Sequence, residues 1–596
     1  MRKPRVQRES VSGTGVGKAG TSTETGTGTG GKIGSELNSH GTRIGEMLVE
    51  RGLATPEQIT QALGQQREVG RLGQILIGMR VVNQTDLTKV LGEQFGLEAI
   101  DLSTQLLEPA AIELIPEARA RSHLVIGISV SEKHLRVAVA EPSKELQQLL
   151  ENVTQHSIEM LLAPISDIRH AIDSHYRALS DVDKLVRAFQ ASEGGRRQST
   201  DAVLQEIIGD DAPIVQVVNR ILTQALRDRA SDVHIEPQDL VVRIRFRIDG
   251  ALKDVLSLPG SMGLGLISRI KIMAEMNIVE RRRPQDGQLT LDIDGKSVDV
   301  RVATVATIAG EKCVMRVLDK TRSVMLLSDL GMPEDTHHKF SELVRAPFGM
   351  VLCAGPTGSG KTTTLYATLS ELNDPSRNIM TIEDPVEYVF RSVNQIQTNE
   401  AAGLTYATGL KSILRQDPDL ILVGEIRDVE TARIAVQSAL TGHFVLSSLH
   451  ATDSVSALHR FLDMGIESFL IASSVLAIVG QRLVRRICPS CKVPYVPSQA
   501  ELSFYQESEG PSKDIFYHGE GCNFCAGTGY YERTGVYEVL RMSPEIKRLI
   551  VGWATQDELR RLAQKQGMRT LREETINLVA KDVTTIGEVI RSIYSL

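Results

Sequence analysis

Gly355-Pro356-Thr357-Gly358-Ser359-Gly360-Lys361-Thr362 sets the architecture of this 596-residue chain. It follows the apolar run 349–354 and precedes Thr363-Thr364-Leu365-Tyr366-Ala367, which is typical of a helix start. The phosphate-binding pattern G-x-x-x-x-G-K-[ST] requires this context of strand, glycine-rich loop and helix, which a chance glycine-rich turn lacks. Because glycine lets backbone N–H groups wrap closely around phosphate oxygens, the loop predicts a nucleoside-triphosphate site.

The chemistry of this site needs few side chains. Lys361 can reach the β- and γ-phosphates, Thr362 can ligate Mg²⁺, and we expect Thr363 to extend the phosphate site. From about residue 330 onward, strand and helix patterns alternate. That alternation predicts an α/β domain with a parallel sheet.

Polar residues follow three further apolar strands of this region. The strands cover 379–382, 420–423 and 444–449, and they lead into Glu383 to Glu387, Glu425 and His450. Singly, each polar residue would more often lie on the surface or in the core. At four successive strand ends they favour a site, because ligands gather at the carboxyl ends of such strands. Glu425 is expected to be the carboxylate on the Mg²⁺ side, and another carboxylate must orient the attacking water.

Four of the six cysteines form two C-x-x-C pairs, Cys488 with Cys491 and Cys522 with Cys525. Two such pairs in one region predict a four-thiolate zinc site without an open ligand position, and hence a structural one. Four unrelated reduced thiols are the alternative. We expect Cys313 and Cys353, which lie in apolar strands, to be core residues.

The composition excludes some classes of protein. A net charge of −7 and only 4% aromatic residues, with one tryptophan, argue against a dedicated nucleic-acid binder. No apolar run reaches the ~18 residues that a membrane span needs. The nearest candidate, 469–480, is interpreted as a buried helix, and the basic N-terminus has no apolar stretch behind it. We therefore expect a cytoplasmic chain whose membrane contacts come through partners.

Shifts in composition predict six segments along the chain. They are a disordered leader (1–40), an N-terminal tandem-repeat domain (41–175), a linker (176–200), a mixed α+β domain (201–325), the P-loop domain with the four cysteines (330–545) and a helical C-terminal region (546–596).

The N-terminal domain contains an internal repeat, in which Arg71 lies 28 positions after Arg43. Gly73 corresponds in the same way to Gly45, and Gln94 to Gln66. Within each copy, the apolar spacing predicts a short helix, a turn and a second helix.

In the mixed domain, strict alternation over 241–250 places Arg243, Arg245 and Arg247 on one face of a strand. Two interpretations stay open, a solvated sheet face and a face that binds an anionic partner.

Together these motifs resemble those of the secretion ATPases that drive type IV pilus assembly and type II secretion. Ser231-Asp232-Val233-His234-Ile235-Glu236-Pro237 and the stretch 281–287 add to the resemblance, which covers roughly 41–596. It implies a RecA-like core, a hexameric ring with ATP between subunits, and an inner-membrane platform protein as partner. It also implies that Glu387 is the catalytic glutamate, Glu425 the Mg²⁺-side acid and His450 a sensor of the nucleotide. Arginines of the preceding domain would approach phosphate, with Arg245, Arg247, Arg281 and Arg282 as candidates.

The repeats resemble a cyclic di-GMP-binding module found on some of these ATPases. The matching positions are Arg43, Gly45, Gln66, Arg71, Gly73 and Gln94, whereas Ile44 and Arg80 depart from the usual leucine and glycine. A helical docking domain is the equal alternative. For the whole chain, the resemblance favours an assembly motor over a second-messenger-responsive docking protein or a DNA-transfer motor, and leaves pilus and secretion pseudopilus open.

Overall fold

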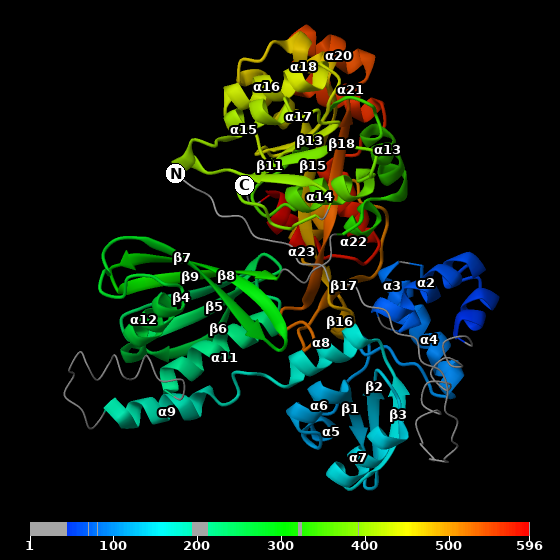
Figure 1. The fold of residues 1–596 in the computed structure, drawn as a ribbon, viewed down its shortest axis with the longest axis vertical. Helices are drawn as coiled ribbons and strands as arrows, with labels where there is room; N and C mark the ends of the chain where they lie inside the picture. The colour runs from blue at the N-terminus through cyan, green and yellow to red at the C-terminus, as the bar shows by residue number, and fades with distance from the viewer. Residues whose placement is uncertain are drawn as a thin grey trace, which may run out of the picture. The chain divides into compact units, whose positions relative to one another are not determined.

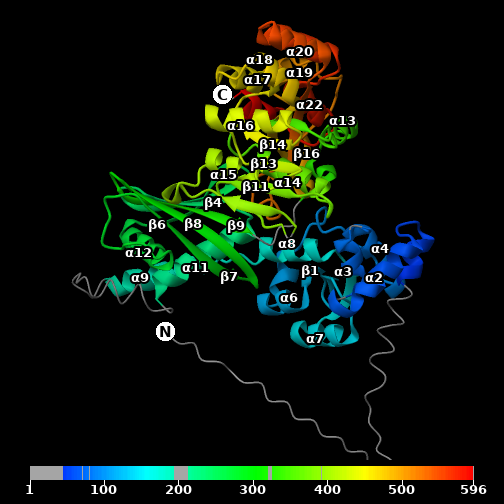
Figure 2. The ribbon, with the colours of Figure 1, turned by 45° about the horizontal axis from the view of Figure 1, so that its top comes forward.

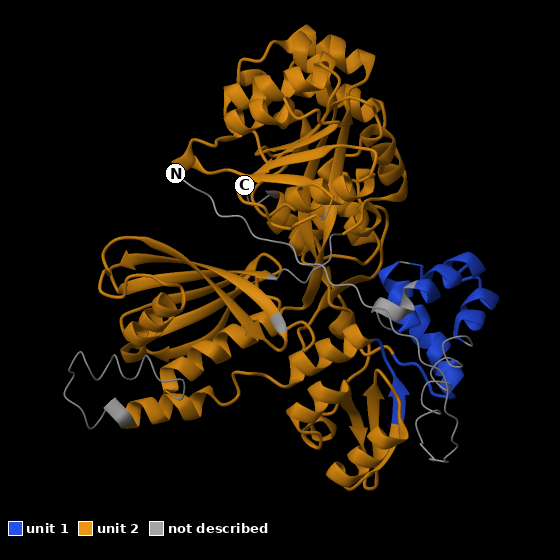
Figure 3. Ribbon diagram, viewed as in Figure 1, with its two compact units in different colours: residues 1–100, 160–164 blue, residues 101–159, 165–596 orange. Residues whose placement is uncertain are grey.

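The computed structural model describes residues 44–69, 71–79, 81–193, 212–319, 325–390 and 392–594. The predicted leader 1–40 lies outside these residues. The chain divides into two compact units, residues 1–100 with 160–164 and all remaining residues (Figure 3).

Helices make up most of the smaller unit, as the repeat pattern predicts. Residues 44–50 are helical. The following helices are α2 (Pro56–Val69), α3 (Leu72–Gly78) and α4 (Gln84–Phe95). Asn83 caps α4 by accepting the backbone N–H of Asp86 at 2.8 Å. One apolar cluster, which includes Leu48, Ile59, Leu76 and Leu87, holds these helices together.

A small mixed region follows. It contains α5 (Pro109–Glu113), α6 (Glu117–His123), β1 (Val125–Val130), β2 (His134–Val139), α7 (Lys144–Thr154), β3 (Ser157–Leu162) and α8 (Ile165–His175). The next helix, α9 (Val182–Glu193), contributes Val182 and Phe189 to the core of the domain that follows. The three strands form a sheet in the order β1-β2-β3.

Residues 212–319 form an antiparallel sheet with two main helices, α11 (Pro213–Arg227) and α12 (Gly263–Met273), which lie on one face of it (Figures 1 and 2). The strand order is β6-β5-β4-β9-β8-β7. The strands are β4 (Asp232–Pro237), β5 (Val241–Ile248), β6 (Ala251–Pro259), β7 (Gln285–Ile293), β8 (Lys296–Thr307) and β9 (Gly310–Asp319). Alternate residues of β5 are fully buried, including Phe246, so its three arginines share the other face as predicted.

The remaining residues are built on a seven-stranded sheet in the order β12-β11-β13-β14-β10-β15-β18. Neighbouring strands are parallel except for the β15–β18 pair. Its strands are β10 (Gly349–Ala354), β11 (Ile379–Glu383), β12 (Asn394–Gln397), β13 (Leu420–Val423), β14 (Phe444–Leu449), β15 (Val475–Ile487) and β18 (Tyr530–Arg541). The central strands are buried on both faces, so their sequences are mostly apolar. The exceptions in β14 are Ser447 and Ser448, whose buried hydroxyls donate to the backbone oxygens of Val423 and Gly424.

Helices cover both faces of this sheet and bury two separate cores. Met350 and Leu352 of β10 face one core, and Val351 and Cys353 face the other. The first core includes residues of α15 (Tyr406–Ile413), α16 (Val429–Leu440), α17 (Ser454–Asp463) and α18 (Ser468–Ser474). The second includes residues of α13 (Glu334–Val344) and α14 (Lys361–Leu372).

The interpretation of 469–480 as a single buried helix is wrong. Helix α18 ends at Ser474, and β15 begins at Val475 between β10 and β18. A short apolar run has no period that separates a buried helix from a strand buried on both faces, so the sequence alone is ambiguous here. None of the described helices is both long and apolar enough to cross a bilayer.

The four cysteines lie in an insertion between β15 and β18. It contains β16 (Lys492–Tyr495), α19 (Gln499–Glu507) and β17 (Phe516–Gly519). The chain then ends in α20 (Pro544–Val551), α21 (Gln556–Lys565), α22 (Leu571–Ala580) and α23 (Ile586–Val589). Cys313 and Cys353, outside the insertion, are buried core residues as expected.

Candidate nucleotide site and four-cysteine centre

The predicted phosphate loop joins the end of β10 to the start of α14. Gly358 and Gly360 have φ angles of +78° and +87°, which residues with a side chain rarely adopt. The Lys361 ammonium donates to the backbone oxygens of Gly355 at 2.9 Å and Pro356 at 3.1 Å. It therefore lies across the mouth of the loop, while Thr362 and Thr363 are exposed at the start of the helix.

Gln481 of β15 supports the loop from beneath, which the sequence analysis missed. Its side chain is 1% exposed and accepts the hydroxyl of Thr364 at 2.9 Å. A Cβ at Gly355 would lie 2.7 Å from the Gln481 backbone oxygen, and one at Gly360 2.8 Å from its Nε2. Both glycines are thus needed for close packing as well as for conformation. Only the position of Gln481 in an apolar strand beside β10 signals this role.

Glu425 and His450 follow adjacent strands, β13 and β14, and they meet. The His450 Nε2 lies 3.2 Å from a carboxylate oxygen of Glu425, so the imidazole N–H can donate to it. The Glu425 side chain is 14% exposed. Burial lowers the pKa of Lys361, and the Glu425 carboxylate opposes this shift. The structure therefore brings Lys361, Glu425 and His450 to one edge of the sheet.

Two further residues reach this edge that the sequence analysis did not single out. Arg427 forms an ion pair with Glu425 and lies 4.0 Å from a carboxylate oxygen of Asp384. Its hydrogen bond to Glu425 raises the pKa of Arg427. Burial, followed by the charges of Glu425 and Asp384, raises the pKa of Tyr406. Both residues come from segments with no motif of their own, so only their places beside β13 reveal them.

Glu387 lies in the loop that follows β11, with an exposed side chain. Its backbone N–H donates to the hydroxyl of Tyr366 at 3.2 Å. Glu383, by contrast, is 3% exposed, and its carboxylate accepts hydrogen bonds from Thr381 and Gln395. Of these two glutamates of the acid-rich stretch, Glu387 is the one free to reach a ligand.

The candidate arginines lie within the mixed domain. Arg245 has nitrogens 3.3 Å from Glu236 and 3.4 Å from Asp254, and Arg247 has one 3.5 Å from Asp232. These pairs are what a solvated, charge-balanced sheet face would show. Arg281 and Arg282 are exposed in the connection between α12 and β7.

The N-terminal motif residues are partly described. Arg43 and the side chain of Gln66 lie outside the described residues, and Arg71 directly precedes α3. Gly45 and Gly73 share one role, because a Cβ would meet Ile59 at 2.9 Å in the first repeat and Leu87 at 2.8 Å in the second.

Gln94 differs from these packing positions. Both polar atoms of its side-chain amide are buried, and neither has a hydrogen-bond partner within the described part of the chain. Since buried polar groups are normally paired, these two atoms have unused capacity to bind a ligand.

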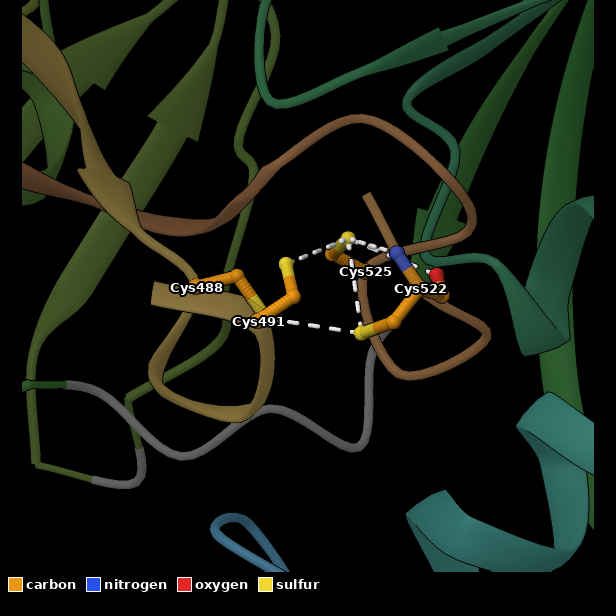
Figure 4. Close-up of side chains that lie close together, drawn as sticks. All are labelled: Cys488, Cys491, Cys522 and Cys525. Atoms are coloured by element: carbon orange, nitrogen blue, oxygen red, sulfur yellow. Dashed lines mark hydrogen bonds between the residues drawn. The ribbon is translucent and has the colours of Figure 1, made fainter. Parts of the chain in front are cut away.

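The four cysteine sulfurs converge on one point, with all Sγ atoms within 4.8 Å of one another (Figure 4). The Sγ–Sγ distances are 3.8 Å for Cys488–Cys522, 3.9 Å for Cys491–Cys525 and 3.8 Å for Cys522–Cys525. A tetrahedral ZnS₄ centre with Zn–S bonds of about 2.3 Å has sulfurs about 3.8 Å apart. The hydrogen bond with Cys488, followed by the backbone N–H groups of Cys522 and Gly529, lowers the pKa of Cys525 to about 4. The cluster therefore has the size and chemistry of a four-thiolate zinc site.

This chain is similar in sequence to known proteins over most of its length. The family described as "Type II/IV secretion system protein" matches residues 208–591, and the "MshEN domain" matches 95–181. "Type IV pilus assembly ATPase PilB" of Myxococcus xanthus (strain DK1622) is 40% identical over 555 residues, which cover 92% of this chain and 98% of its own. "Type II secretion system protein E" of Xanthomonas campestris pv. campestris is 37% identical over 567 residues, covering 93% and 99%. The solved "Structure of MshE with cdg" is 32% identical, covers 22% of this chain and 98% of its own, and has a TM-score of 0.21.

The phosphate loop on a parallel sheet, with acids and a histidine at neighbouring strand ends, defines a P-loop ATPase. The chain belongs to the type II/IV secretion system protein family. This confirms the predicted resemblance, α/β fold class and enzyme class. The MshEN match begins at residue 95, so the repeats of 43–94 directly precede it.

Proposed function

We propose that this ATPase powers assembly of a type IV pilus or of a type II secretion pseudopilus. The observation that carries the proposal is the similarity of this chain to a type IV pilus assembly ATPase and to a type II secretion system protein E, each over more than nine tenths of its length. The same proposal includes a homo-hexamer with ATP between subunits, a cytoplasmic location, and an inner-membrane platform protein that receives the motion.

We assign roles to the residues at the strand ends. Lys361 and the backbone of 355–362 would hold the phosphates, and Thr362 and Glu425 would hold a Mg²⁺ ion that neutralises phosphate charge. Glu387 orients the attacking water, because its exposed side chain is available for it. His450 reports the state of the nucleotide through its contact with Glu425.

Arginines from the mixed domain of a neighbouring subunit would complete the site. Arg281 and Arg282 are exposed, and Arg245 and Arg247 already pair with carboxylates. To contact the nucleotide, Arg245 and Arg247 would each exchange a carboxylate partner for a phosphate group, which the planar guanidinium group also binds well.

We propose a structural zinc ion at the four cysteines, since its four thiolates leave no open ligand position. The N–H groups of Cys522 and Gly529 donate to the Cys525 sulfur at 3.2 Å each, which stabilises the deprotonated ligand.

We also propose that residues 41–175 form a regulatory module that binds cyclic di-GMP. The paired repeats and the adjoining MshEN domain support this assignment. So does the side-chain amide of Gln94, which has no hydrogen-bond partner among the described residues. Isothermal titration of the full chain with cyclic di-GMP tests it. Binding at micromolar ligand that is lost in Gln94→Ala supports the module, and no heat in the unchanged chain assigns the repeats to helical docking instead.

A complementation experiment tests the motor role. A strain without this chain should lose either its pili or a set of secreted proteins, and Glu387→Gln should fail to restore them although it accumulates normally. Normal pili and secretion in the deleted strain would reject the proposal. A defect confined to DNA transfer would point to the related transfer motors, and full rescue by Glu387→Gln would point to a docking protein.

A further inference from the structure

The hydroxyl of Tyr366 connects helix α14 with the loop that carries Glu387. It donates to the carboxylate of Glu383 and accepts the backbone N–H of Glu387 at 3.2 Å. Tyr366 is 2% exposed, so neither bond competes with bulk water. The hydroxyl hydrogen and one lone pair of the oxygen are therefore both used in hydrogen bonds, which fix the orientation of the hydroxyl.

The Glu383 carboxylate, which accepts the Tyr366 hydroxyl, is itself held in place. Its second carboxylate oxygen accepts the Thr381 hydroxyl at 2.6 Å and the Gln395 amide at 3.2 Å. Burial, followed by the hydrogen bond to Glu383, raises the pKa of Tyr366. The phenol thus stays protonated at neutral pH and acts as a stable donor.

Gln395 holds the loop just beyond Glu387. Its Nε2 donates to the backbone oxygen of Tyr388 at 2.9 Å, and its Oε1 accepts the backbone N–H of Phe390 at 2.8 Å. The rings of Tyr388 and Phe390 pack edge-on against the Tyr366 ring, with centroids 5.9 and 5.3 Å away. The backbone on both sides of Tyr388 is therefore held, while the Glu387 side chain remains exposed.

We propose that Tyr366 is a positioning residue for ATP hydrolysis, which acts by fixing the backbone of Glu387. The inference rests on the proposed role of Glu387 in orienting the attacking water. Tyr366 and Lys361 belong to the same helix, α14, so one rigid element holds both the phosphates and the loop that carries the water-orienting carboxylate. Errors of about 1 Å in such placement lower rates by about 100-fold.

Tyr366→Phe removes the hydroxyl and keeps the ring contacts. We expect kcat to fall by about 10- to 100-fold, whereas KM and the affinity for a fluorescent ATP analogue stay unchanged. Tyr505→Phe is the matched control, because Tyr505 is 3% exposed and donates one hydrogen bond, to the Pro511 oxygen at 3.0 Å, away from the site. It also loses a hydrogen bond of a buried tyrosine hydroxyl, although one bond fewer than Tyr366→Phe loses, and it should retain its kcat. Equal losses of kcat in the two variants would mean a purely structural effect and would overturn the proposal.

A double-mutant cycle tests whether Tyr366 acts through Glu387. In a Glu387→Gln background, Tyr366→Phe should lower kcat no further, and independent, multiplying losses overturn the inference. Wild-type turnover in Glu387→Gln alone refutes the proposed role of Glu387 itself. Wild-type turnover in Tyr366→Phe, with Glu387→Gln inactive, refutes only the inference. Gln395→Leu, which frees the same loop from the other side, should reproduce the kcat defect if Tyr366→Phe does not fold.

Discussion

The imidazole of His450 contacts the carboxylate of Glu425 at 3.2 Å, across the ends of two adjacent parallel strands. The contact joins a residue that follows β14 to one that follows β13, and Glu425 also carries the ion pair with Arg427. A substitution at His450 or Arg427 therefore removes a contact of Glu425, the carboxylate to which we assign the Mg²⁺ ion.

His450→Ala should lower kcat by about 10- to 100-fold, because a hydrogen bond to a charged group contributes about 1.5–3 kcal/mol. Steady-state phosphate release measures it. His443→Ala is the control, since His443 precedes the same strand at its opposite end. Unchanged turnover in His450→Ala would mean that the histidine does not contribute to ATP hydrolysis.

Gly355→Ala should weaken ATP binding at least about tenfold, because the added Cβ would lie 2.7 Å from the Gln481 backbone oxygen and displace the loop. Titration with a fluorescent ATP analogue checks this. Gly64→Ala meets nothing within 4 Å and should leave the affinity unchanged. If Gly355→Ala binds normally, the packing described for the loop is wrong.

Cys491→Ser should reduce bound zinc from about one ion per chain to almost none and lower the melting temperature. Elemental analysis and thermal denaturation measure the two effects. Cys313→Ala, in a buried strand outside the cluster, should keep its zinc. If the wild-type protein contains no zinc and Cys491→Ser leaves its melting temperature unchanged, the proposed structural metal is refuted.

Glu588→Gln should destabilise the chain by about 3–5 kcal/mol at neutral pH, because it leaves Arg485 without the partner of a buried ion pair. Desolvation raises the pKa of Glu588, but the hydrogen bonds from Arg591 and Arg485 outweigh it and leave the pKa below the usual 4.5. The stabilisation is therefore complete above about pH 4.5 and is lost as the pH falls through the lowered folded-state pKa.

Urea denaturation of both proteins between pH 7 and pH 3 shows whether the difference narrows with acid as expected. Glu430→Gln, which loses only the exposed pair with Lys411, should change stability by about 0–1 kcal/mol. A difference for Glu588→Gln that stays constant over this range would refute the ionised pair.

The parts of the site that the sequence predicts are those encoded in continuous segments. The phosphate loop, Glu425 and His450 each follow an apolar strand, and parallel pairing then brings strand ends together. The C-x-x-C spacing likewise predicts the cluster of four sulfurs.

The supporting residues could not be predicted in this way. Gln481 and Gln395 act across segments distant in sequence, and no local pattern distinguishes them from other strand residues. Tyr366 lies in the predicted helix, but its hydrogen bond with the backbone of Glu387 depends on the path of the loop that follows β11. The local sequence does not specify that path. The prediction of one buried helix over 469–480 is wrong from Val475 onward, because burial on both faces removes the alternation that marks a strand.

Steady-state phosphate release by the assembled protein, with and without Glu387→Gln, tests the central claim most directly. The unchanged chain should hydrolyse ATP, and the variant should bind ATP equally well but turn it over about 100-fold or more slowly. Equal turnover by the two proteins would contradict a catalytic Glu387 at this site.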